Sequence, residues 1–158
     1  MIEINGLRVN YIDVGSGTPV VFVHGLAGAK EWFCYQSAGL REKYRVISYD
    51  LRLARGRVKY SLDLLVDDLS AFLTALRIPN AVIAGHSFGG LVALKFASAH
   101  PDACRAVVLI STAPDYSDIP REEILENMVP GKIEFEPWLK RLWKMLFNRA
   151  QVKVETKG

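Results

Sequence analysis

A short apolar run that ends in a glycine-rich turn and continues as a helical pattern is the feature that most constrains this chain. Residues 81–84 read Ala-Val-Ile-Ala, and residues 85–90 read Gly-His-Ser-Phe-Gly-Gly. The apolar run predicts a buried strand, and the segment after it has the period of a helix. A strand and a helix joined so closely need small residues at the bend, because side chains at 85 and 89 would collide. Ser87 is therefore expected in a strained backbone conformation, with its hydroxyl raised above the sheet.

Strands and helices alternate on both sides of this turn. Continuous apolar runs are typical of strands buried in a parallel sheet, and the segments between them have helical spacing. The alternation predicts the α/β class, a mostly parallel sheet covered by helices on both faces. The expected strands are Ile2–Asn5, Arg8–Val14, Val20–Val23, Arg45–Asp50, residues 81–84 and Ala106–Ile110, and the expected helices run to about Glu42, from a Ser61 cap to Leu76, and from the turn to Pro101.

Composition narrows the class of protein. The chain has 158 residues and a net charge of +3, and no basic cluster is interleaved with aromatic residues, so we expect no nucleic-acid partner. No apolar stretch approaches the length that spans a membrane, and the first residues lack the pattern of a signal region. Cys34 and Cys104 lie in different elements, which favours free thiols and a cytoplasmic location.

The pattern changes after residue 111. We interpret residues 1–111 as the α/β core and residues 112–158 as a partial cap that ends in a polar tail. Within it, residues 138–149 predict an amphipathic helix with tryptophans and leucines on one face and basic residues on the other. This helix is interpreted as part of a cap over the site, with a contact to a membrane surface or to a second copy as alternatives.

Three motifs together resemble the α/β-hydrolase fold superfamily. They are His24-Gly25, Asp50-Leu51-Arg52 and residues 85–90, in the family's order and spacing. The nearest likeness is to the small single-domain branch of esterases, enol-lactonases and cofactor-free haloperoxidases. Serine at the turn argues against the related dehalogenases, which use aspartate there.

The resemblance implies a set of site residues. Ser87 matches the family's nucleophile, and the backbone amides of Leu26 and Phe88 match its oxyanion hole. Supporting positions around the turn and the preceding loop are His24, Gly25, Gly85, His86 and Gly89. It implies no metal and no organic cofactor, and a small carboxylic ester or lactone as the substrate. Asp50 and Arg52 are expected to pair locally.

The family's catalytic histidine has no match in this chain. It follows the eighth strand in relatives, whereas this sequence is interpreted as ending after the sixth strand and part of a cap. We interpret His86 and His24 as supporting residues and His100 as a helix-end residue. Asp115, where some relatives keep their acid, is interpreted as a turn residue.

Two hypotheses remain. In the first, the chain is a truncated serine hydrolase with weak activity, or another chain supplies its base. In the second, it is a catalytically silent module that associates with itself. If later strands are absent, Ala106–Ile110 becomes an exposed sheet edge. We therefore expect a homo-oligomer formed through this edge or through the 138–149 helix.

Overall fold

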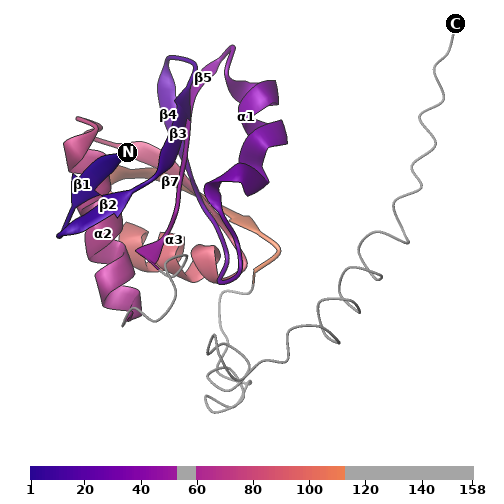
Figure 1. Cartoon of the computed structure of the whole chain (residues 1–158). Helices are drawn as coiled ribbons and strands as arrows, with labels where there is room; N and C mark the ends of the chain where they lie inside the picture. Colours follow the sequence, from indigo (N-terminus) through magenta and orange to yellow (C-terminus); the bar gives the residue numbers. More distant parts are fainter. Residues whose placement is uncertain (53–59, 113–158) are drawn as a thin grey trace, which may run out of the picture. The chain divides into compact units, whose positions relative to one another are not determined.

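The sheet is the centre of the fold, and it has four parallel strands and one antiparallel strand at its edge. A computed structural model describes residues 1–52 and 60–112 of the chain (Figure 1). The strand order is β3-β5-β4-β6-β7, in which only the β3–β5 pair is antiparallel. Its strands are β3 (Tyr11–Val14), β4 (Thr18–Val23), β5 (Tyr44–Tyr49), β6 (Ala81–His86) and β7 (Cys104–Ile110).

Helices cover both faces of the sheet, as the alternating pattern predicts. Helices α2 (Leu62–Ala75) and α3 (Phe88–Ala99) lie on one face, and α1 (Cys34–Leu40), preceded by the 3-10 turn η1 (Lys30–Phe33), lies on the other (Figure 1). Each face of the sheet has its own hydrophobic core, and successive residues of β4 pack alternately into one core and the other. Val21 and Val23 pack in the cluster that includes α2 and α3, whereas Val20 and Phe22 pack with Phe33. The α/β class is therefore confirmed.

The predicted cap lies almost wholly outside the described part of the chain, which stops at residue 112. The proposed boundary at residue 111 and the amphipathic segment 138–149 stay predictions. In the described ranges, no helix combines the length and the apolar character needed to cross a membrane.

Local capping and turn signals correspond closely to the observed elements. The Ser61 hydroxyl accepts a hydrogen bond from the Leu64 amide at 3.1 Å, so α2 begins with the predicted cap. Helix α3 ends before Pro101, which opens the 3-10 turn η3 (Pro101–Ala103). Asn5 and Gly6 both have positive φ and join β1 (Ile2–Ile4) to β2 (Leu7–Val9).

One predicted strand is divided in two. The sequence predicts a single strand over 8–14, but the chain breaks at Asn10 and β3 joins the main sheet instead of the hairpin. The Asn10 carbonyl accepts a hydrogen bond from the Asp50 amide at 2.9 Å, just beyond the end of β5. Asn10 is therefore where the chain leaves the hairpin and enters the sheet. A periodic pattern does not reveal this change of partner.

Register brings three strand ends to one edge of the sheet. Val23 at the end of β4 lies opposite Tyr49 of β5 and Gly85 of β6. Because these strands are parallel, the loops that follow them emerge at the same carboxyl edge. Those loops contain the three motifs singled out in the sequence.

Candidate functional site

Ser87 sits at the sharp turn between β6 and α3. Its backbone has φ 51° and ψ −122°, a combination outside the regions that residues with side chains ordinarily adopt. Two hydrogen bonds hold this turn: the Ser87 amide donates to the Ile110 carbonyl at 2.9 Å, and the Gly90 amide donates to the Ser87 carbonyl at 2.8 Å. The predicted strained conformation is confirmed, and such strain concentrates at functional sites.

The two glycines around Ser87 allow backbone segments to approach closely. A Cβ atom on Gly85 would lie 2.2 Å from the Gly89 carbonyl oxygen, so β6 and the start of α3 leave no room for one. A Cβ atom on Gly89 would lie 2.2 Å from the Val23 carbonyl oxygen, which belongs to β4. The helix therefore begins directly against the neighbouring strand, and the collision expected at both positions is confirmed.

The loop after β4 lies against the Ser87 side chain. A Cβ atom built on Gly25 would be 3.2 Å from the Ser87 Cβ atom. The loop closes as a turn in which the Gly28 amide donates to the Gly25 carbonyl at 3.0 Å. Leu26 directly follows Gly25, and Phe88 directly follows Ser87.

The amides of Leu26 and Phe88 are both available as donors. Phe88 is the first residue of α3, so its N–H has no acceptor within the helix. Within residues 1–52 and 60–112, neither amide has a hydrogen-bond acceptor. The N-terminus of α3 also carries a partial positive charge. This arrangement can stabilise negative charge on an oxygen bound beside Ser87.

His24 is fully buried, and both of its ring nitrogens are engaged. The Leu51 amide donates to Nε2 at 3.0 Å, so this nitrogen must be the acceptor. The proton is therefore on Nδ1, which donates to the Gly25 carbonyl at 2.6 Å. Burial lowers the pKa of His24, in keeping with a neutral ring. His24 holds the loop and has no free nitrogen with which to accept a proton from Ser87.

His86 packs beside the site. Its ring lies edge-on to Trp32 of η1, with the ring centroids 6.0 Å apart, and burial lowers its pKa. The buried Nδ1 atom finds no hydrogen-bond partner among the described residues. His86 therefore packs beside the turn through its ring, without a hydrogen bond at Nδ1 to any described residue. Phe88, on the other side of the turn, lies edge-on to Tyr60 at 6.3 Å.

His100 lies at the other end of α3 from Ser87. It follows the last residue of the helix, and its ring contacts Phe96 with the centroids 5.0 Å apart. A 12-residue helix separates it from Ser87, which is about 18 Å at 1.5 Å per residue. Its interpretation as a helix-end residue agrees with this position.

The expected local pair between Asp50 and Arg52 is wrong. Arg52 forms a two-pronged ion pair with Asp68 of α2, at 2.6 Å and 2.7 Å. Asp50 instead accepts a hydrogen bond from the Lys30 amide at 3.0 Å and lies 3.5 Å from the Lys30 ammonium. Sequence reasoning missed Asp68 because it is an acidic residue within a helix pattern, 16 positions from its partner. A buried position on α2 occupied by an acid was the available signal.

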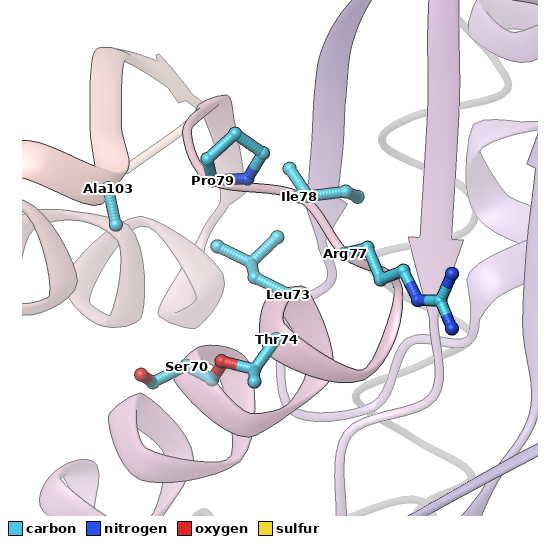
Figure 2. Close-up of a pocket in the computed structure, with 7 residues that line it drawn as sticks. All are labelled: Ser70, Leu73, Thr74, Arg77, Ile78, Pro79 and Ala103. Carbon is cyan, nitrogen blue, oxygen red and sulfur yellow. The ribbon is translucent and has the colours of Figure 1, made fainter.

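A cavity of about 500 Å³ lies away from Ser87. It is formed where α2 ends and β6 begins, and its apolar wall includes Leu73, Ile78 and Ala103 (Figure 2). The Arg77 guanidinium points away from this wall in Figure 2. Because β6 runs from this end to Ser87, the two places are about 20 Å apart along the strand. The cavity is therefore no part of the candidate active site.

A family model for the alpha/beta hydrolase fold matches residues 18–142. The chain belongs to this family. The α/β-hydrolase assignment rests on most of the chain, and it agrees with the sheet order and the turn at Ser87. It also accounts for the order in which the three motifs follow the ends of β4, β5 and β6.

Similar proteins include several hydrolases. A 2-hydroxymuconate semialdehyde hydrolase from Pseudomonas sp. (strain CF600) is 35% identical over 117 residues, which are 68% of this chain and 41% of that protein. Bifunctional epoxide hydrolase 2 of Sus scrofa is 31% identical over 166 residues, covering 90% of this chain and 30% of that one. The structure of the enol-lactonase from Burkholderia xenovorans LB400 superposes on this chain with a TM-score of 0.65 and is 28% identical in sequence. The superposition covers 70% of this chain and 45% of that one. The chain thus spans less than half the length of each relative.

Proposed function

We propose that this chain belongs to a serine hydrolase that cleaves carboxylic esters or lactones through an acyl-enzyme on Ser87. The observation that carries the proposal is the conformation of Ser87, with φ 51°, directly against the Gly25 loop. Two observations support it: Ser87 lies against the residue that precedes Leu26 and directly precedes Phe88, and the amides of Leu26 and Phe88 have no acceptor among the described residues. The hydrolases among its relatives support the reaction class.

In the proposed reaction, the Ser87 hydroxyl oxygen attacks the carbonyl carbon of the substrate and gives up its proton to a base. Negative charge gathers on the former carbonyl oxygen, which faces the amides of Leu26 and Phe88. The carbon–oxygen bond to the alcohol then breaks, and the alcohol leaves with a proton. Water attacks the resulting ester of Ser87 and releases the acid. A lactone follows the same steps, with its alcohol and acyl group on one molecule.

Among the described residues, no histidine is placed to act as the base. The chain has three histidines, all in the part that the structure describes, and none forms a hydrogen bond with Ser87. Without a base, triad enzymes retain only about 10³–10⁴-fold acceleration over water, from the oxyanion hole and substrate binding. The 158-residue chain alone is therefore expected to be a weak esterase. A longer form of the protein or another chain would supply the base.

Chemical rescue with imidazole tests this assignment. Cleavage of a p-nitrophenyl ester by the full 158-residue chain should increase with imidazole concentration, because imidazole can accept the Ser87 proton. Imidazole also cleaves such esters directly, so the Ser87→Ala variant provides the blank. We expect a rescued rate in the unmodified chain and none in Ser87→Ala. Equal rates in the two proteins would contradict the proposal.

The second candidate is a catalytically silent module that associates with itself. It is favoured by the absence, within the described residues, of a histidine bonded to Ser87, and by the exposed position of β7 at the sheet edge. If light scattering gives the mass of an oligomer, and if imidazole produces no Ser87-dependent cleavage, this function is favoured over the first.

A further inference from the structure

The peptide group between Gly25 and Leu26 is fixed from its oxygen side. The Gly25 carbonyl accepts two hydrogen bonds, from His24 Nδ1 at 2.6 Å and from the Gly28 amide at 3.0 Å. A peptide group is planar and trans, so the direction of the C=O bond determines the opposite direction of the next N–H. Hydrogen bonds to the carbonyl also polarise the group and make its N–H a stronger donor. The contact with His24 therefore aims the Leu26 amide.

His24 in turn depends on the position of Leu51. The Leu51 amide donates to Nε2 at 3.0 Å and selects the ring tautomer that places the proton on Nδ1. Leu51 is itself buried, with 1% of its surface exposed, in the loop that follows β5. If the Leu51 amide moved away, Nε2 would lose the donor that keeps it unprotonated. The His24 proton would then be free to move between the two nitrogens.

The residue after Leu51 anchors this loop to α2. Arg52 binds both carboxylate oxygens of Asp68, and Asn5 from the β1–β2 turn donates to the same carboxylate at 2.9 Å. Asp68 is buried, with 3% of its surface exposed. Three segments that are distant in sequence thus meet at one carboxylate, directly beside the loop that carries Leu51.

We propose that Asp68 and Arg52 are positioning residues for the Leu26 amide, acting through Leu51 and His24. The inference rests on the proposed function, in which Leu26 is an oxyanion donor. A buried ion pair is weak evidence for stability, since apolar residues of similar volume often do as well. The role of the Arg52–Asp68 pair is therefore positional: it holds the Leu51 amide in place and, through His24, sets the direction of the Leu26 N–H.

The chain offers a matched control. Arg45 and Asp13 form the same two-pronged pair, at 3.0 Å and 2.7 Å, where β5 begins. That pair is more exposed and lies at the opposite end of β5 from Leu51. The substitutions Asp68→Asn and Asp13→Asn therefore each remove the negative charge and one of the two acceptor oxygens, from pairs that lie near the two ends of β5. Only the first should disturb the loop.

Nitrogen NMR of the full 158-residue chain gives the decisive measurement. In the unmodified chain we expect a scalar coupling across the hydrogen bond between the Leu51 amide and His24 Nε2, and an unprotonated Nε2. In Asp68→Asn we expect a mixture of His24 tautomers, a shifted Leu26 amide resonance and at least about tenfold faster hydrogen exchange at Leu51. Asp13→Asn should leave all three as they are.

A merely structural ion pair predicts a different result. Asp68→Asn would then be less stable, but its folded form would keep the His24 tautomer and the Leu26 resonance of the unmodified chain. That outcome overturns the proposal. Should Asp68→Asn fail to fold, Arg52→Lys keeps the charge and removes the two-pronged contact, and the same signals are measured. Absence of the scalar coupling in the unmodified chain overturns the proposal without any variant.

An activity measurement separates this inference from the proposed function. In the imidazole assay, Arg52→Lys should lower kcat by about tenfold or more while KM changes little, because an oxyanion donor acts in the transition state. If the unmodified chain shows no Ser87-dependent cleavage, the proposed function fails. The NMR measurement still decides whether Asp68 positions the Leu26 amide.

Discussion

The buried imidazole of His24 makes the stability of this fold depend on pH. Burial lowers its pKa, and the Gly25 carbonyl and the Asp50 carboxylate only partly oppose this effect. In the unfolded chain the ring binds a proton near its ordinary pKa of about 6.5. Below that pH the unfolded state therefore holds more protons than the folded state. The free energy of unfolding should fall as pH drops below about 6.5, and level off once pH is below the folded pKa.

The His24→Gln variant isolates this contribution. A glutamine oxygen can accept the Leu51 hydrogen bond but does not titrate. Urea unfolding between about pH 7.5 and about pH 5 should show a larger loss of stability for the unmodified chain than for the variant. Burial also lowers the pKa of His86. Because His86 is present in both proteins, it changes the pH dependence of their stability in the same direction. Equal losses would mean that His24 is not the group responsible.

At the scale of the elements, the effect of a glycine substitution on stability depends on what packs against the helix at that position. Gly89→Ala would place a Cβ atom 2.2 Å from the Val23 carbonyl oxygen, so α3 would have to move away from β4. We expect a loss of stability at the upper end of about 1–3 kcal/mol, or beyond it. A Cβ atom on Gly39 of α1 would meet no packing neighbour within 4 Å among the described residues, and Gly39→Ala should stabilise the helix by about 0.5–1 kcal/mol. Urea unfolding of both variants measures the two opposite signs.

Gly89→Ala should also change the site, since the same glycine sets the start of α3 beside Ser87. We expect the imidazole-rescued rate to fall in this variant even under conditions where it is fully folded. Gly39→Ala should retain the rate of the unmodified chain. A Gly89→Ala protein with unchanged stability would contradict the close approach of α3 to β4.

Local signals made the elements and the turn predictable, whereas contacts between distant segments were not. The Ser61 cap and the bend at Ser87 depend on residues within a few positions of one another, so their patterns are visible in the sequence. Arg52 finds its partner on α2, and the wrong expectation of a pair with Asp50 came from considering neighbours only. The engagement of both His24 nitrogens also requires the fold, because Leu51 and His24 follow different strands.

At the scale of the whole molecule, the sheet formed by residues 1–52 and 60–112 ends in β7, which has one edge without a partner strand in these ranges. β7 pairs only with β6 among the strands of the described residues, and its Val108 and Leu109 side chains are 45% and 40% exposed. These neighbours point to opposite faces, so apolar surface is exposed on both sides of the edge. Unpaired backbone groups beside such surface favour pairing with another strand. We therefore propose that copies of this chain associate through β7.

Substitution at the edge tests this association. Val108→Lys places a charge on the strand, a change that discourages pairing between edges. We expect light scattering at micromolar concentration to give the mass of an oligomer for the unmodified chain and a smaller mass for the variant. Tyr35→Lys replaces a residue that is 86% exposed on α1, away from β7, and should leave the mass unchanged. A monomeric mass for the unmodified chain would contradict the proposal, and an equal effect of both substitutions would place the contact elsewhere. A mass that decreases only for Val108→Lys would identify β7 as the surface that the sheet leaves open for a further strand.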